Sequence, residues 1–382
     1  MVPRLGTVVP SKHPNEVFDL YSIPAFDSGE PQVVAGRAIG SAKQIVEPGD
    51  VLLSRIVPHI RRAWVVGEAQ DRRIIASSEW IVFRSKRADP NYLRHMLVND
   101  QFHAEFMRTV SGVGGSLLRA RPAYVSKIRL PLPPLPEQRR ISIILDKADH
   151  LRVARRATLT QLAELTRSAF LDMFGDPASK GWSMTNIAGI ANPAKGSIRT
   201  GPFGSQLLHG EFTDSGIAVL GIDNVVANEF RWGDRRFISE EKYRQLKRYT
   251  VRPGDVLISI MGTCGRCAVV PDDIPSAINT KHLCCITPDR AKCLPVFLHA
   301  YFLQHPIARR FLAQTAKGAI MSGLNMGLIE EMPVPLPPMD LQLEFKRKME
   351  SSGKMKTAML KSLAEFDSLF ASLQHRAFRG EL

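Results

Sequence analysis

Five cysteines, all in the second half of the chain, are the residues best suited to hold a metal. Cys264 and Cys267 have the CxxC spacing that places two thiolates on one zinc ion, and Cys284 and Cys285 follow them. The second pair is adjacent, and neighbours on a strand point to opposite faces, so both can hardly reach the same metal. His282 would complete a ligand set, but without a helix-borne spacing. We predict packed, reduced thiols, no metal and no disulfide framework.

Three further runs come close to catalytic motifs. Asp89–Tyr92 reads DPNY, near the DPPY of amino-methyltransferases, but no glycine-rich cofactor loop precedes it, and we predict the start of a helix. Gly196–Phe203 reads GSIRTGPF, with proline where a phosphate-binding loop requires lysine. Asp272 and Asp273 are not followed by the carboxylate-x-Lys of a metal-dependent nuclease, and we predict a surface turn. The sequence therefore predicts no catalytic residues.

Basic and polar loops are instead suited to bind nucleic acid. The chain has 51 Lys+Arg against 37 Asp+Glu, a net charge of +14, which is typical of a polyanion binder. Lys and Arg contact phosphates, and in the major groove Arg reads guanine while Asn and Gln read adenine. The candidates in the first half lie in SRIVPHIRR and GSLLRAR: Arg55, His59, Arg61, Arg62, Ser116, Arg119 and Arg121.

The candidates in the second half lie in a glycine-punctuated loop, KGSIRTGPFGSQL, in MGTCGR and in the segment 317–325. They are Lys195, Arg199, Thr200, Ser205, Gln206, Arg266, Lys317 and Asn325. An ordinary tight turn is an alternative for the first of these loops. The other two occupy places equivalent to the basic runs of the first half, which favours a functional role for them.

The segments that must position these residues occur twice. EPGDVLLS (Glu47–Ser54) returns 205 residues later as RPGDVLIS (Arg252–Ser259), and PLPPLPEQ (Pro131–Gln138) returns 204 residues later as PLPPMDLQ (Pro335–Gln342). Between these anchors, residues 88–97 match residues 293–302, again at a shift of 205. Three anchors in register indicate an internal duplication. The duplication also argues against a catalytic role for DPNY, because its counterpart in the second copy, LPVF, lacks the acid.

Each copy has the same order of predicted elements. Strand-like runs such as VLLS, WIVF, VLISI and HLCCIT are bounded by Gly, Pro and Asp and alternate with shorter helices such as Asn91–Arg108. A proline-rich hinge and a long helix follow. The predicted fold class is α/β: two α/β recognition domains, 1–130 and 179–334, joined by two helical spacers, 131–178 and 335–382. At 382 residues, two or three domains are expected.

Heptad spacing predicts that each long helix has about 35 residues, or roughly 50 Å at 1.5 Å per residue. Pro136 suits the first helical position and Gly175-Asp176-Pro177 supplies a stop. We expect the two helices to pair as an antiparallel coiled coil with an internal pseudo-twofold axis; separate packing of each helix on its own domain is the alternative. The expected seams are Ile141, Ile144, Ala148, Leu151, Arg155, Thr158, Leu162, Leu165 and Ala169 in the first helix, and Phe345, Met349, Ser352, Lys356, Met359, Leu363, Phe366, Phe370, Leu373 and Ala377 in the second.

The N-terminus, MVPRLGTVVPSK, lacks the apolar segment of a signal peptide, and no run of about 18 apolar residues occurs in the sequence. We therefore expect a soluble cytoplasmic protein without a membrane partner.

Together, the hinge PLPPLPEQ, the helix end LAELTRSAFLDMFGDP and their second forms, PLPPMDLQ and LFASLQHRAFRGEL, resemble the specificity subunits of type I DNA restriction-modification systems. The resemblance covers essentially the whole chain. It implies two target-recognition domains that each read half of a split target in double-stranded DNA. It also implies two methyltransferase subunits, which use S-adenosylmethionine to methylate adenine, and two translocating endonuclease subunits. This chain would hold no cofactor itself, and ATP with Mg would act on the partners.

Two other functions stay open from the sequence. A self-contained restriction or modification enzyme would need the methyl-donor or nuclease motifs that the sequence lacks. A basic adaptor for RNA or protein would bind in a salt-dependent manner without preference among DNA sequences.

Overall fold

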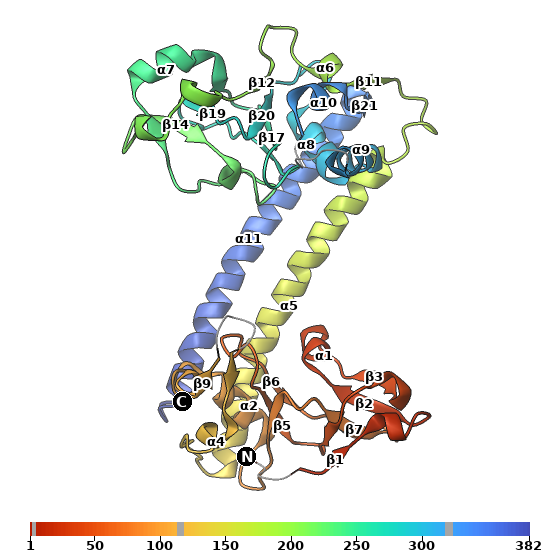
Figure 1. Ribbon diagram of the computed structural model, residues 1–382, viewed down its shortest axis with the longest axis vertical. Helices are drawn as coiled ribbons and strands as arrows, with labels where there is room; N and C mark the ends of the chain where they lie inside the picture. Colours follow the sequence, from red (N-terminus) through yellow and green to blue (C-terminus); the bar gives the residue numbers. More distant parts are fainter. Residues whose placement is uncertain (2–4, 113–117, 318–323) are drawn as a thin grey trace. The chain divides into compact units, whose positions relative to one another are not determined.

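The structure, a computed structural model, describes residues 1, 5–112, 118–317 and 324–382, without the side chains of 315–317. The chain forms two compact units (Figure 1). Unit 1 comprises Met1–Ala157 and Leu360–Leu382, and unit 2 comprises Thr158–Met359. Both boundaries lie within the long helices. Each unit therefore contains one set of sheets and a part of each long helix.

Unit 1 contains a five-stranded sheet with the order β1-β4-β7-β2-β3 and a three-stranded sheet with the order β6-β5-β8. A short ribbon, β9-β10, and small helices complete it. The bounds are β1 (Thr7–Val8), β2 (Val17–Tyr21), α1 (Ile23–Ser28), β3 (Gln32–Ala35), β4 (Lys43–Ile45), β5 (Val51–Ser54), β6 (Ala63–Val65), β7 (Arg73–Ala76), β8 (Trp80–Phe83), α2 (Pro90–Val98), α3 (Asp100–Met107), β9 (Val110–Ser111), β10 (Arg119–Ala120) and α4 (Pro122–Val125).

Unit 2 contains a five-stranded sheet with the order β13-β15-β14-β19-β16, a four-stranded sheet with the order β12-β20-β17-β18 and the pair β11-β21. The bounds are β11 (Met184–Asn186), α6 (Ile187–Ile190), β12 (Ile198–Thr200), β13 (Phe212–Thr213), β14 (Ile217–Leu220), β15 (Phe237–Ile238), α7 (Glu240–Leu246), β16 (Thr250–Val251), β17 (Val256–Ser259), β18 (Cys267–Val269), β19 (Ala277–Asn279), β20 (Leu283–Ile286), α8 (Pro295–Gln304), α9 (Pro306–Lys317), α10 (Met326–Glu331) and β21 (Pro333–Pro335).

The strand order confirms the duplication. In unit 1, β2 and β7 pair in parallel, and β4 adds to β7 antiparallel. In unit 2, β14 and β19 pair in parallel, and β16 adds to β19 antiparallel. The repeated strand β5 lies between β6 and β8 just as β17 lies between β18 and β20. The two units therefore share a mixed α/β plan, and β12 is an addition at the edge of the second sheet of unit 2.

The turn before β5 and β17 is fixed by a buried carboxylate in both copies. Asp50 accepts a hydrogen bond from the amide of Glu47 at 2.9 Å, and Asp255 accepts one from the amide of Arg252 at 2.9 Å. Gly49 and Gly254, which precede these aspartates, have φ of 83° and 80°, a conformation that glycine adopts without strain. This geometry explains why the sequence Pro-Gly-Asp occurs in both copies.

The prediction that DPNY starts a helix is confirmed. α2 begins at Pro90, and the Asp89 carboxylate caps it by accepting from the amide of Tyr92. The sequence predicts one helix over Asn91–Arg108, but the structure has two. Asn99 adopts an extended conformation, which ends α2, and its side chain caps the second helix, α3. In unit 2, α8 and α9 are separated in the same way at His305.

A buried glutamine attaches each long helix to its unit. The side-chain amide of Gln138 donates to the carbonyls of Arg87 and Pro133, and its oxygen accepts from the amide of Asp89. In unit 2, Gln342 makes the same three contacts with Lys292, Pro337 and Leu294.

Both glutamines are at most 1% exposed. The hinge motif therefore ends in a residue that joins the proline-rich hinge, the start of the long helix and the segment before α2 or α8.

The long helices are α5 (Leu135–Phe174) and α11 (Met339–Ala377). α5 begins one residue before the predicted Pro136 and ends at the predicted Gly175-Asp176-Pro177 stop. In unit 1, Arg152 of α5 forms an ion pair with Asp367 of α11 at 2.6 Å. In unit 2, Phe170 packs against Phe345, with ring centroids 5.4 Å apart. Residue numbers rise along α5 as they fall along α11, so the predicted antiparallel pairing is confirmed.

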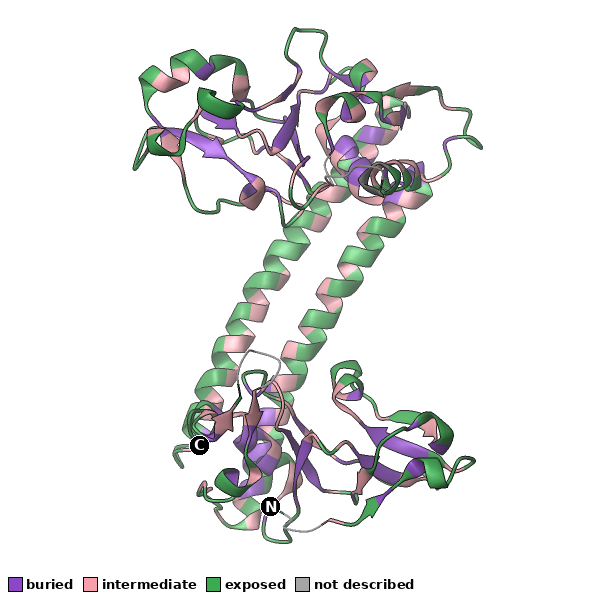
Figure 2. Ribbon diagram, viewed as in Figure 1, coloured by how far each residue is buried: buried purple, intermediate pink, exposed green. Residues whose placement is uncertain are grey.

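The predicted seam of α5 is wrong at two positions, and its other members are buried or half-buried. Leu151 and Leu165 are 46% and 66% exposed, whereas Leu145, next to the predicted Ile144, is fully buried. Arg152 lies in the seam and places its guanidinium 4.3 Å from the centre of the Phe370 ring. In α11 the predicted apolar positions are buried or half-buried, but Lys356 is exposed. Figure 2 shows exposed and half-buried residues alternating along both long helices.

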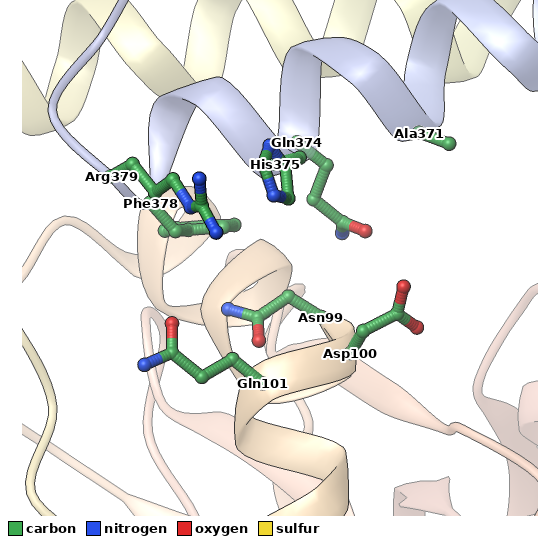
Figure 3. Close-up of a pocket in the computed structure, with 8 residues that line it drawn as sticks. All are labelled: Asn99, Asp100, Gln101, Ala371, Gln374, His375, Phe378 and Arg379. Atoms are coloured by element: carbon green, nitrogen blue, oxygen red, sulfur yellow. The ribbon is translucent and has the colours of Figure 1, made fainter.

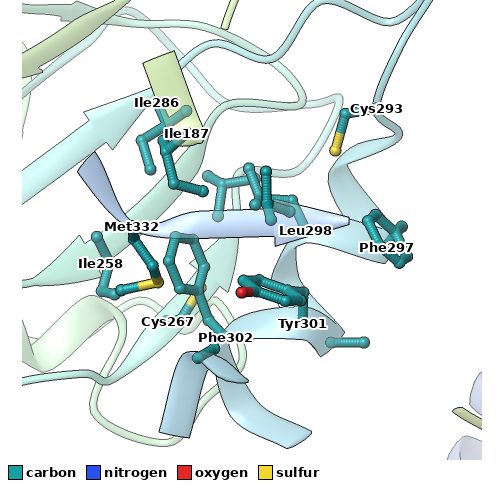
Figure 4. Close-up of a cluster of buried hydrophobic side chains, with 14 of the residues drawn as sticks. Ile187, Ile258, Cys267, Ile286, Cys293, Phe297, Leu298, Tyr301, Phe302 and Met332 are labelled. Atoms are coloured by element: carbon teal, nitrogen blue, oxygen red, sulfur yellow. The ribbon is translucent and has the colours of Figure 1, made fainter. Parts of the chain in front are cut away.

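The core of unit 2 surrounds α8 and includes most of the cysteines (Figure 4). Cys284 packs in this cluster, whereas Cys285 packs in the cluster of the opposite sheet face. This difference agrees with the argument that the adjacent pair cannot share a metal. Burial raises the pKa of the Cys284 and Cys293 thiols to about 12 and raises the pKa of Cys267 and Cys285 as well.

We therefore expect slow thiol modification in the native protein. Cys264 is half-buried and the other four cysteines are buried. A thiol reagent at pH 8 should modify at most one of the five thiols rapidly and all five after unfolding in guanidinium. Rapid modification of two or more thiols in the native protein would contradict this packing.

None of the helices in the described part of the chain combines the length and hydrophobicity needed to cross a lipid bilayer.

Candidate nucleic-acid interface

The structure brings together two basic runs of unit 1 that are far apart in the sequence. Ile56 bridges to Arg119, and the amide of Ala120 donates to the carbonyl of Arg55 at 2.8 Å. Arg55 and Arg119 both lie beside the Glu79 carboxylate, at 3.6 and 3.5 Å. One carboxylate thus serves two half-exposed guanidinium groups, and a positive charge remains on this surface. The pairing favours a shared role for the two runs.

The other candidates in unit 1 differ in their exposure. Arg62 makes a bidentate contact with Asp27, and its side chain is 11% exposed, so its geometry favours a structural role. Arg61 pairs with Asp100 at 2.6 Å but lies at the surface. His59 is exposed. Arg121 donates to the Ser111 hydroxyl and lies over the ring of Tyr124. Ser116 lies outside the described residues.

The candidates of the glycine-punctuated loop in unit 2 separate into surface and buried groups. Lys195, Ser205 and Gln206 are exposed, and Thr200 is half-buried. Arg199 is buried and donates to Asp255 at 2.6 Å. The placement of Arg199 favours a structural role over the DNA contact predicted from the sequence. The other four residues stay predicted contacts.

Arg266 lines an open pocket of about 430 Å³ in unit 2. Arg309, on α9, lines the same pocket, together with Thr263 and Leu324. Asn325 caps α10 by accepting from the amide of Leu328, and its side chain is at the surface. Lys317 ends α9, and its side chain lies outside the described part. Leu324, which lies just before α10, and the loop that carries Arg266 therefore line the same pocket.

Sequence reasoning missed several cations that the fold brings to these surfaces. Arg309 is one of them, and Lys247, Arg248 and Arg252 line a second pocket in unit 2 together with Lys195. Arg309 lies on α9, Lys247 and Arg248 follow α7, and Arg252 begins the repeated turn RPGD, an anchor of the duplication. A signal was available at Arg252, because its counterpart in the first copy is Glu47.

A further pocket, of about 390 Å³, lies in unit 1 between the start of α3 and the end of α11 (Figure 3). Asn99, Asp100 and Gln101 face His375 and Arg379 across it. Its lining contains none of the residues predicted to contact DNA. It also places an acidic side chain beside basic ones, which does not favour a polyanion.

The side chains do not form a metal centre in the part of the chain that the structure describes, where no group of three or more His, Cys, Asp or Glu residues has the required proximity.

No family model matches the sequence. Among curated proteins, the chain is 28% identical over 286 residues to the type I restriction enzyme EcoBI specificity subunit of Escherichia coli, a match that covers 66% of this chain and 58% of that protein. It is 25% identical over 305 residues to the EcoKI specificity subunit of E. coli K12, covering 70% and 61%. The chain thus spans about three fifths of the length of these relatives.

Solved structures share the fold. A chain from the assembly of a type I R-M system aligns over 99% of this chain and 95% of its own, with a TM-score of 0.59 and 20% identity. The S subunit of a type I restriction-modification system from M. genitalium aligns over 99% and 97%, with a TM-score of 0.54 and 11% identity. The duplicated α/β units, the paired long helices and these comparisons lead to one conclusion: the chain is similar in sequence to type I restriction enzyme specificity subunits and shares the fold of type I restriction-modification S subunits.

Proposed function

We propose that this chain is a sequence-specific DNA-binding subunit that reads a bipartite target, one half with each unit. The observation that carries the proposal is that two units that share the order of most of their strands carry different basic surfaces. Unit 1 presents Arg55 and Arg119 around a shared carboxylate, and unit 2 presents Arg266 and Arg309 around a pocket. A repeated scaffold with different exposed side chains suits two half-sites of different sequence.

The chemistry would belong to partner subunits. We infer that two methyltransferase subunits bind this chain and methylate adenine with S-adenosylmethionine, and that two endonuclease subunits, with ATP and Mg, join the full complex. The curated relatives are specificity subunits of restriction enzymes, which supports this division of labour. In this arrangement the chain holds no cofactor, and the antiparallel long helices set the gap between the half-sites.

Mapping of methylated adenines in the host genome tests the proposal. A strain that expresses the partner subunits should contain a bipartite methylated motif, and deletion of this gene should abolish it. A catalytically inactive methyltransferase subunit gives the matched control, because the motif should vanish there as well. An unchanged methylome after deletion, or methyl transfer by the purified chain alone, would refute the proposal.

A further inference from the structure

A pocket of about 420 Å³ in unit 2 is surrounded by cations. Its walls are the loop before β12, with Lys195 and Gly196, and the turn that follows α7, with Lys247, Arg248 and Arg252. Its lining contains four exposed Lys and Arg side chains and no Asp or Glu. Like charges that converge on one cavity repel each other, so an anionic ligand would stabilise this arrangement.

These cations are not neutralised by the protein. The side chains of Lys195, Lys247 and Arg252 form no ion pair or hydrogen bond within the described part of the chain. Arg248 lies over the ring of Tyr249, with its guanidinium carbon 4.9 Å from the ring centre, a contact that leaves its charge in place. The four charges are therefore available to a ligand that enters the pocket.

The buried Arg199 holds the two walls of the pocket together. Its guanidinium donates to the carbonyl of Gly196 at 3.1 Å on one wall and to the carbonyl of Thr250 at 2.6 Å on the other. It also donates to Asp255 at 2.6 Å, while Thr287 donates to the other oxygen of the same carboxylate. Arg199 is thus a positioning residue, and its partner Asp255 is screened from the pocket by its own hydrogen bonds.

The first copy provides an internal comparison. There the buried Asp50 is held by Arg84, which follows β8 where Thr287 follows β20. Arg84 also pairs at 2.8 Å with Glu47, the counterpart of Arg252. In unit 2, a strand without an equivalent among the described residues of unit 1, β12, supplies Arg199 instead. The acid at this place is replaced by an arginine without a partner, so the positive pocket is not required by the shared scaffold.

We propose that this pocket binds a phosphate group, and that the phosphate is part of the DNA backbone. The inference rests on the proposed function, since DNA is the polyanion that this subunit would meet. Lys and Arg contacts to phosphates position a protein on the duplex without reading its sequence. The pocket would therefore anchor unit 2 on DNA while other residues, such as Arg266, read the bases.

The salt dependence of DNA binding tests the proposal. The full chain, copurified with its methyltransferase subunits, is titrated with a labelled duplex that carries the methylated motif, at salt concentrations from about 50 to 200 mM. The variant Lys247→Ala/Arg252→Ala should reduce the slope of log K against log salt by about 2, one for each cation removed, and leave the motif preference unchanged. Arg252→Glu, which restores the acid of the first copy, should weaken binding further.

The double variant Arg235→Ala/Arg244→Ala removes two exposed cations of unit 2 outside the pocket and serves as the control. An equal slope in the wild type and the pocket variant would overturn the inference while specific binding by the wild type upholds the proposed function. If the wild type showed no preference for the motif, the proposed function would be refuted instead.

A second experiment measures binding of inorganic phosphate and of ATP by calorimetry. If the wild type bound them saturably and the pocket variant did not, while the salt slope of DNA binding stayed unchanged, the assignment of the pocket to DNA would be overturned.

Discussion

Gln342→Ala is expected to lower the free energy of unfolding of unit 2 by about 3 kcal/mol or more, since a buried polar group left without its partner costs about 1–3 kcal/mol. The truncation would take a partner from three backbone groups: the carbonyl of Pro337, whose contact is buried, and the carbonyl of Lys292 and the amide of Leu294, whose contacts are partly buried. The side chain is fully buried, so water cannot easily replace it. Gln138→Ala should have a similar effect on unit 1, because its three contacts are the same in kind.

The measurement is chemical denaturation followed by tryptophan fluorescence for each variant. Gln161→Ala, at an exposed position of α5, is the matched control and should change stability by less than about 0.5 kcal/mol. The variants should also lose DNA binding, since the glutamine attaches the long helix to its unit. Wild-type stability in either hinge variant would contradict the role that we assign to this residue.

Arg199→Ala is expected to cost about 3–5 kcal/mol, the usual effect of removing one partner from a buried ion pair. Asp255 is fully buried, and Arg199 is 9% exposed and makes four hydrogen bonds. The loss would leave a buried carboxylate with a reduced set of donors. Arg84→Ala, in the first copy, should cost less, because the Arg84 side chain is 38% exposed and water can enter the space that it leaves beside the buried Asp50.

Thermal and chemical denaturation of both variants compare the two copies directly. Arg248→Ala, at an exposed position of the same pocket, controls for the loss of a nearby positive charge and should leave stability almost unchanged. Equal stability of Arg199→Ala and Arg248→Ala would contradict the role of Arg199 in holding the two walls of the pocket together.

Much of the fold was predictable because the duplication repeats features with local physical causes. The Pro-Gly-Asp turn and the ends of α5 depend on neighbouring residues, and they lie where the sequence indicated. The seam of α5 was not fully predictable. Leu151 and Leu165 fit a heptad as well as their neighbours do, and the aliphatic stem of an arginine can occupy an apolar seam, as Arg152 does beside Phe370.

The candidate interface was less predictable, because the state of an arginine depends on carboxylates from distant segments. Arg62 is paired with Asp27, 35 residues away, and Arg199 with Asp255, 56 residues away. No local pattern distinguishes such structural arginines from exposed ones such as Arg266. Comparison of the two copies gives part of that information, since the exchange of Glu47 for Arg252 marks a surface that the scaffold does not require.

The most direct test of the account is the methylated motif of a hybrid in which residues 179–334 come from another specificity subunit of known target. If each unit reads one half-site, adenine methylation mapping should show that one half of the motif changes to that of the donor. The other half and the gap should be retained, because unit 1 and the long helices are unaltered. A motif in which both halves change, or neither does, would contradict the assignment of one half-site to each unit.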